Sequence, residues 1–233
     1  MFKVIKLKPI MIGVALVLVS MLLSVGIMAV ANIENKNIPK PQYTIVIDAG
    51  HGGRDDGCSG RSGIKESGIN LMIAKTLKSY LETLDINIVM TRSDGNGLYS
   101  ANAKNYKQSD MENRIKIIDE AAPNMVISIH QNSFSDSAQR GAQAFFQEGD
   151  EKSRILAENV QKQLLDQLPE ARVESNDGDY YLLKESGVPA IIVECGYLTN
   201  EEDERLLGTE EYRNQVAYAV MCGVIRYLGV QGN

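Results

Sequence analysis

The chain has 233 residues and a formal net charge of −6 at pH 7, and its 23% of charged residues is close to the globular average, which excludes wholesale disorder. Because a domain usually has about 100–200 residues, this length predicts one domain, or one domain with an appendage. Residues 1–40 hold five lysines and one glutamate, which leaves 19 basic and 29 acidic residues in the remainder. An acidic body binds phosphate backbones poorly, so we expect no nucleic-acid partner.

The N-terminal segment predicts contact with a membrane. Residues 10–31 form an uncharged run that follows three lysines and is long enough to span a hydrocarbon core of about 30 Å. The run ends in Ala-Val-Ala, a pattern that signal peptidase cuts, so residues 1–31 are expected to be an uncleaved anchor or a cleaved signal peptide. Residues 32–41, with two prolines, are expected to be a linker before a folded domain at 42–230. The positive-inside rule places that domain outside the cytoplasmic membrane.

The first half of the body begins with a short β-rich run at 43–48. Residues 67–84 follow, with apolar side chains every three or four positions, which predicts a helix with one buried face. A second strand is predicted at 86–91. Residues 92–110 are polar and rich in Gly and Asn, and we expect a loop there, either a lid that contacts glycan or a disordered segment.

The rest of the body continues to alternate strands and helices. The predicted elements are a helix at 111–121, strands at 125–129 and 142–147, a helix at 151–168, a short strand at 181–183, a buried strand at 190–194 and a helix at 210–228. Strands separated by helical stretches predict an α/β fold, a three-layer sandwich with a mostly parallel central sheet.

The only two histidines of the chain both lie where a predicted strand ends. His51 follows the first strand and His130 follows the strand at 125–129, while Glu194 ends the strand at 190–194 and Glu66 opens the first helix. Ligands bind beyond the carboxyl ends of strands in open α/β sheets. Taken singly, a half-buried histidine or a glutamate in a surface ion pair explains each position. Together, two His and two Glu are the ingredients of a catalytic zinc site, with three ligands and one general base.

Five short motifs occur in order along the body. They are DAGHGG at 48–53, GIKE at 63–66, TR at 91–92, SIHQN at 128–132 and VECGYLTN at 193–200. Together they resemble the zinc-dependent N-acetylmuramoyl-L-alanine amidases of the amidase-3 class. The resemblance implies a phosphorylase/hydrolase-like fold, one Zn²⁺ held by His51, Glu66 and His130, and a catalytic Glu194. Asp48 and Asn132 are candidates for orienting the histidines, or they serve only a strand-end turn and an Asx-turn.

The resemblance also implies a substrate and a setting. The substrate is peptidoglycan, and the bond cut joins N-acetylmuramic acid to L-alanine. A short chain with an N-terminal anchor is similar to the spore-cortex members of this class, which act with a polysaccharide deacetylase to form muramic-δ-lactam. This implies action outside the cytoplasmic membrane or between the forespore membranes, anchored or secreted, and leaves room for an accessory protein.

Two other functions compete with this interpretation. The first is a cysteine hydrolase that uses Cys195 or Cys58, which would require a histidine partner to form the thiolate. Cys195 continues a buried strand, so a small apolar filler is the simpler role for it. The second is a non-catalytic wall-binding module, for which the sequence offers no repeats or aromatic array.

Overall fold

The computed structural model describes residues 42–168 and 170–231. The predicted anchor or signal peptide at 1–31 and the linker at 32–41 lie outside the described residues. Within the described part, no helix is long and apolar enough to cross a membrane.

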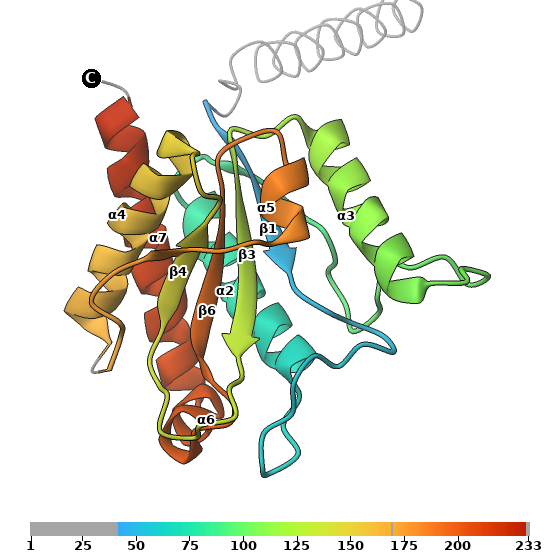
Figure 1. The fold of residues 1–233 in the computed structure, drawn as a ribbon. Coiled ribbons are helices and arrows are strands. Elements are labelled where there is room, and N and C mark those ends of the chain that lie inside the picture. The colour runs from blue at the N-terminus through green and yellow to red at the C-terminus, as the bar shows by residue number, and fades with distance from the viewer. Residues whose placement is uncertain (1–41, 169, 232–233) are drawn as a thin grey trace, which may run out of the picture. The chain divides into compact units, whose positions relative to one another are not determined.

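The described residues form a single six-stranded sheet in the order β2-β1-β3-β6-β4-β5 (Figure 1). The strands are β1 (Thr44–Ala49), β2 (Asn87–Met90), β3 (Met125–Asn132), β4 (Gln143–Phe146), β5 (Asn176–Asp177) and β6 (Ala190–Tyr197). β2, β1, β3 and β6 run parallel, whereas β4 pairs antiparallel with β6. The predicted α/β fold with a mostly parallel sheet is therefore confirmed.

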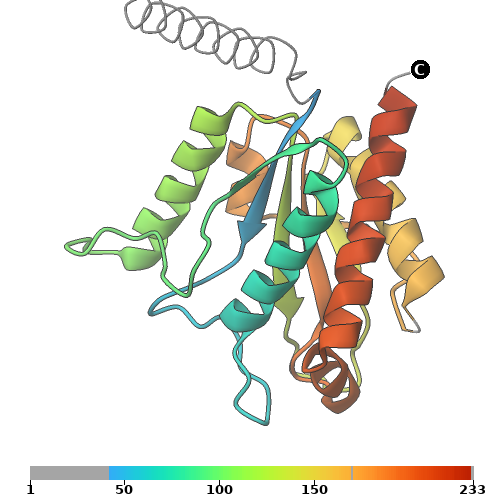
Figure 2. The ribbon, with the colours of Figure 1, turned by 180° about the vertical axis from the view of Figure 1, so that it is seen from behind.

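Helices cover both faces of the sheet, which makes three layers (Figures 1 and 2). α2 (Glu66–Glu82), α4 (Glu151–Gln167) and α7 (Glu210–Gln231) lie together on one face. α3 (Tyr106–Ala121) and the short α5 (Tyr181–Glu185) lie on the other face, while α6 (Glu201–Leu207) lies between β6 and α7 along the chain. The two faces thus receive very different amounts of helix.

The alternation of side chains along each strand divides the core in two. We call the face under α2, α4 and α7 the closed face; its buried residues include Ile47, Ile127 and Val193. We call the face under α3 and α5 the open face; its buried residues include Val46, Ile192 and Leu182. The closed face holds most of the buried apolar side chains, so most of the hydrophobic stabilisation comes from that side.

The prediction of a strand at 181–183 is wrong, because this segment forms helix α5. The amide of Lys184 bonds to the carbonyl of Tyr180 at 3.2 Å, a helical turn, and both Leu182 and Leu183 are buried against the open face. α3 begins at Tyr106 rather than at 111, because the side chain of Asn105 caps it by accepting a hydrogen bond from the amide of Gln108. The polar first turn of α3 has no apolar periodicity, which hid it in the sequence.

Candidate active site

The carboxyl ends of β1, β3 and β6 lie side by side, and the functional candidates gather there. β3 is longer than predicted, so His130 lies within it rather than after it, and its register partner in β6 is Glu194. His51 lies two residues beyond the end of β1, and Glu66 is the first residue of α2. Three parallel neighbours and one helix start therefore bring the two histidines and the two glutamates to one edge of the sheet.

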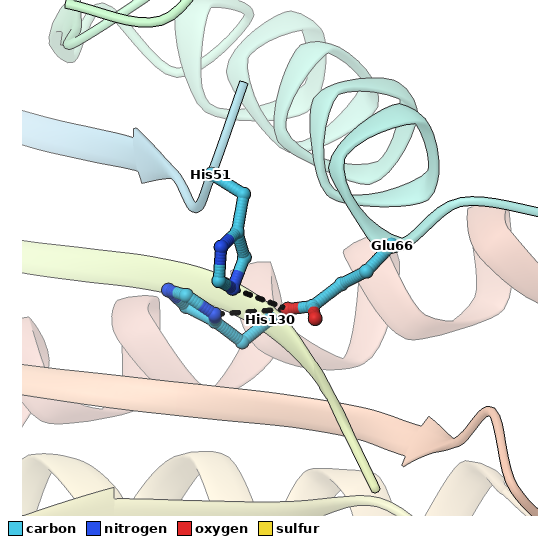
Figure 3. Close-up of side chains that lie close together, drawn as sticks. All are labelled: His51, Glu66 and His130. Carbon is cyan, nitrogen blue, oxygen red and sulfur yellow. Dashed lines mark hydrogen bonds and ion pairs between the residues drawn. The ribbon is translucent and has the colours of Figure 1, made fainter. Parts of the chain in front are cut away.

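The side chains of His51, Glu66 and His130 point toward one another (Figure 3). Oε1 of Glu66 lies 3.2 Å from Nε2 of His51 and 3.0 Å from Nδ1 of His130. One ligand atom from each residue lies within 4.8 Å of those of the other two. Two imidazole nitrogens and one carboxylate oxygen are a donor set that suits zinc and leaves a fourth position open, so the residues present fit such an ion.

The electrostatics of this cluster favour a cation. Burial lowers the pKa of His51, but Glu66 and Asp55 outweigh burial and raise this pKa to about 9. Burial raises the pKa of Glu66, but hydrogen bonds from the two histidines hold it well below its usual range. Glu66 is therefore ionised at neutral pH, and its negative charge lies between two groups that can either take up protons or bind a metal ion.

Besides the two histidines, three hydrogen-bond donors fix the carboxylate of Glu66. Its Oε2 accepts from the amide of Cys58 at 2.9 Å. Its Oε1 accepts from the amide of Gln131 at 3.1 Å and from Nδ2 of Asn70 at 3.2 Å. Nε2 of Gln131 in turn donates to Oδ1 of Asn70 at 3.1 Å, so the groups that hold Glu66 hold one another. Such outer contacts orient a ligand and tune its basicity.

The loop that carries His51 is held by two buried arginines. His51 has a φ of 61°, in the left-handed region that disfavours residues other than glycine. Arg114 donates to the carbonyl of His51 at 2.7 Å, and Arg92 donates to the carbonyl of Gly50 at 2.9 Å. Both arginines also donate to the carbonyl of Ala49, at 2.8 and 2.9 Å. Three consecutive carbonyls are thus bound by guanidinium groups, which fixes the path of the strained loop.

Asp55 is a functional candidate that the sequence analysis missed. Its Oδ2 lies 2.9 Å from Nδ1 of His51, while Nε2 of the same ring faces Glu66. A carboxylate on the far nitrogen of an imidazole fixes the ring orientation and raises its basicity as a ligand. The signal in the sequence is only a spacing of four residues within a glycine-rich loop, where an aspartate usually serves a turn.

Gly50 leaves room for the ring of His130. A Cβ atom built on Gly50 would lie 2.2 Å from Nε2 of that ring, closer than real contacts allow. His130 of β3 therefore packs directly against Gly50 just after the end of β1, and glycine at position 50 is required by this close packing.

Glu194 differs from Glu66 in having an unsatisfied atom. It is buried, and its Oε2 has no hydrogen-bond partner among the described residues. Burial, together with Glu66, raises the pKa of Glu194 to about 7, although the two histidines pull it down. A carboxylate poised near neutrality beside a cluster of imidazoles is suited to general base and acid chemistry.

Of the two roles considered for Asp48 and Asn132, direct orientation of the histidines has no hydrogen bond to support it among the described residues. Asp48 accepts hydrogen bonds from Thr91 and Ser128 at 2.7 and 2.6 Å and also pairs with Arg114. It therefore fixes the arginine that holds the His51 loop, one step away from the ring. The carbonyl of Asn132 accepts from the amide of Leu198, and in the described chain no hydrogen bond joins its side chain to either histidine.

The cysteines lie near the cluster but are poorly suited to act as nucleophiles. Cys195 is fully buried in the closed face, and burial raises the pKa of its thiol well above the usual range. Burial and the neighbouring Glu66 also raise the pKa of the Cys58 thiol well above the usual range. Because the thiolate is the reactive form, this geometry disfavours the cysteine hydrolase alternative.

Two imidazoles and a carboxylate at the strand ends of an α/β sandwich form a site of the kind that can hold a metal ion. The sequence model of the N-acetylmuramoyl-L-alanine amidase family, Amidase_3, matches residues 45–226, and the chain belongs to this family of peptidoglycan amidases. The resemblance stated from the five motifs is therefore confirmed.

Relatives of known sequence and structure agree with this assignment. The chain is 34% identical to the uncharacterized protein YqiI of Bacillus subtilis over 79% of this chain and 84% of that protein. It is 28% identical to the germination-specific N-acetylmuramoyl-L-alanine amidase of the same organism, over 84% of each. The structure of the CwlD amidase from Clostridioides difficile, in complex with the GerS lipoprotein, superposes with a TM-score of 0.78 at 33% identity, over 81% of this chain and all of that one.

Proposed function

We propose that His51, Glu66 and His130 hold one Zn²⁺ and that Glu194 is the general base of amide hydrolysis. The observation that carries this proposal is the convergence of three ligand atoms within 4.8 Å beside a buried glutamate with an unpartnered oxygen. Bound zinc would lower the pKa of a coordinated water to about 7 and polarise the amide carbonyl. Glu194 takes a proton from the attacking water and delivers it to the amine of L-alanine as the bond breaks.

The roles of the neighbouring residues follow from their contacts. Asp55 holds the ring of His51 so that Nε2 faces the cluster. Asn70 and Gln131 hold the carboxylate of Glu66. Because these groups are fixed before substrate arrives, the site requires little rearrangement at the moment of reaction.

Metal analysis and product analysis test this proposal together. Purified full-length chain should contain about one zinc ion, and chelation should abolish release of stem peptides from peptidoglycan, with recovery on addition of Zn²⁺. Alkylation of thiols should leave activity intact, which separates the metal mechanism from the cysteine mechanism. Full activity in metal-free protein would contradict the zinc site, and binding to peptidoglycan without cleavage would favour a wall-binding module.

We also propose a role in maturation of the spore cortex, outside the cytoplasmic membrane or between the forespore membranes. The support is similarity to a germination-specific amidase and to a CwlD amidase, together with the apolar run at 10–31. In this role, stem removal lets a deacetylase complete muramic-δ-lactam, and residues 1–31 anchor the chain or direct its export. The CwlD neighbour is bound to a lipoprotein, so an accessory protein of that kind is part of the proposal.

Muropeptides from spores of a deletion strain test the cortex role. They should lack muramic-δ-lactam, and the wild-type gene should restore it whereas a Glu194→Gln copy should not. Normal lactam in the deletion strain would overturn this role. Mass analysis of the native N-terminus distinguishes an uncleaved anchor from a cleaved signal peptide at residues 1–31, since a start at Asn32 means cleavage.

A further inference from the structure

A cavity of about 250 Å³ opens from the histidine cluster across the open face of the sheet. His51 and His130 line it, together with tyrosines 99, 106, 180 and 181. The apolar side chains of Met111, Leu182 and Ile192 complete the lining. The cavity exists because α3 and α5 cover this face incompletely, and it leads directly to the proposed metal site.

The tyrosine walls are preformed. The rings of Tyr99 and Tyr106 pack edge to face with centroids 5.7 Å apart, and the hydroxyl of Tyr99 accepts a hydrogen bond from the amide of Arg54 at 3.0 Å. On the other side, the ring of Tyr180 packs against Phe145 of β4. Loop 91–105 is therefore an ordered wall of the cavity, which favours the lid over the disordered segment as the interpretation of this region.

Among the described residues that line this cavity, Lys107 is the lysine or arginine side chain that remains available to an anion. Arg114 also lines the cavity, but it is buried and its charge is matched by Asp48 and Asp110. The side chain of Lys107 is 64% exposed, and its ion pair with Asp55 is long, with Nζ 3.7 Å from Oδ1 and so beyond hydrogen-bond distance. An anionic group that enters the cavity would therefore find Lys107 with unused donors.

The shape of the substrate decides which part enters the cavity. A glycan strand continues in both directions from each muramic acid, so a partly enclosed cavity cannot take in one sugar without its neighbours. The stem peptide is a side branch, and it can enter end-on. After L-alanine, the stem has a γ-linked D-glutamate, whose α-carboxylate is free or amidated.

We propose that this cavity binds the first residues of the stem peptide and that Lys107 recognises the free α-carboxylate of the second residue. Lys107 is then a specificity-determining residue, which favours stems with γ-linked D-glutamate over stems with D-isoglutamine. The inference rests on the proposed metal site, because the scissile amide has to lie at His51 and His130 while the stem occupies the cavity.

Two synthetic substrates test this proposal on the full-length, zinc-loaded enzyme. They are disaccharides that carry L-Ala-D-Glu or L-Ala-D-isoGln, identical except for one carboxylate. Wild-type enzyme should have a KM for the free acid about three- to fivefold below that for the amide, the range of a partly exposed ion pair. Lys107→Met should remove this difference by raising the KM for the acid, and Lys107→Arg should keep it. Added salt should shrink the difference in the wild type.

Lys104 provides the matched control. It is exposed, lies three residues earlier and is outside the cavity lining, so Lys104→Met should keep the wild-type preference. Equal KM values for the two substrates in the wild type would overturn the inference. An equal rise for both substrates in Lys107→Met would also overturn it, because Lys107 would then act through Asp55 and His51. If the zinc-loaded wild type cleaved neither substrate, the proposed function itself would fail.

Discussion

The closed and open faces of the sheet are built from alternate residues of the same strands, but the closed face holds most of the apolar core and the open face holds the cavity. On the closed face, the long helices α2, α4 and α7 bury a continuous apolar core. On the open face, α3 and the five-residue α5 cover a small apolar cluster and leave a cavity. Asp48, His130 and Glu194 occupy positions of the open-face register, one residue out of step with the core residues Ala49, Ile129 and Val193.

This difference shows how a single strand can serve stability and chemistry at once. Polar side chains cost free energy when buried without partners, so they are found where helices do not close over the sheet. Glu194 is next to Val193 in the chain. The Oε2 atom of Glu194 has no hydrogen-bond partner among the described residues, whereas Val193 is buried in the apolar core of the closed face. Substitutions on the two faces should therefore be distinguishable by whether activity or stability changes.

The largest effect is expected for Glu194→Gln on the open face. The amide keeps the size of the side chain but cannot hold the proton, so turnover should fall about 10²–10⁴-fold while zinc remains bound. Glu66→Gln should instead lower zinc content, because a charged ligand is lost. Metal content and turnover of both variants decide the assignment. Loss of zinc in Glu194→Gln with zinc kept in Glu66→Gln would mean that the two roles are reversed.

Leucine truncations on the two faces compare their contributions to stability. Leu77→Ala removes a fully buried side chain of α2 from the closed face and should lower the free energy of unfolding by about 3–5 kcal/mol. Leu182→Ala in α5 should lower the free energy of unfolding by only about 2 kcal/mol, because this side chain borders an existing cavity. The same variant should raise the KM for peptidoglycan substrates, because Leu182 lines that cavity. Urea unfolding and steady-state kinetics measure both. A larger stability loss for Leu182→Ala would reverse the ranking of the two faces.

Acid should destabilise the open face through Asp48. Burial raises the pKa of Asp48, but Arg114, Ser128 and Thr91 outweigh burial and lower it to about 2. A depressed pKa stabilises the folded state above the ordinary value near 4, and this contribution, about 2 kcal/mol, is lost as pH falls from about 4 to 2. Urea unfolding at pH 5, 4, 3 and 2 measures the loss.

The control for the acid experiment is Asp48→Asn. This variant is less stable at neutral pH, because Arg114 loses a partner, but it should show a smaller decline between pH 4 and 2 than the wild type. Parallel declines in the two proteins would assign the acid sensitivity to other carboxylates.

The smallest effect is expected on the outer surface of α2, away from both faces. Lys78 and Glu82 form an exposed pair one helical turn apart. Lys78→Ala should change the free energy of unfolding by only about 0.3–0.5 kcal/mol and leave turnover unchanged. A change in the midpoint of urea unfolding comparable to that of Leu77→Ala would contradict this, because the surface of the helix would then contribute as much as its core face.

The sequence predicted the closed face better than the open one, and the reason is physical. Regular apolar spacing predicted α2 and the buried strands, because these elements bury one continuous stripe or run. α5 was predicted as a strand because five residues are too few to show a helical period, and the first turn of α3 was missed because it is polar. His51, Glu66, His130 and Glu194 were found because strand ends in an α/β sheet converge.

The supporting residues of the site could not be found in the same way. Asp55 contacts His51 within a loop whose path depends on arginines at 92 and 114, far away in the chain. Hydrogen bonds from side chains to backbone carbonyls leave no periodic trace in a sequence. Asp48 was placed next to a histidine by proximity in the chain, whereas the strand directs it toward Arg114.

The left-handed backbone at His51 has a consequence for how tightly the site can bind a cation. A residue other than glycine in this conformation costs about 1–3 kcal/mol, which the buried arginines offset when the chain folds. At the proposed zinc site His51 is therefore preorganised, so an arriving ion would lose little of its binding free energy to ordering the loop. The affinity for such an ion would then depend in part on the guanidinium groups of Arg92 and Arg114, which hold the loop through its backbone carbonyls.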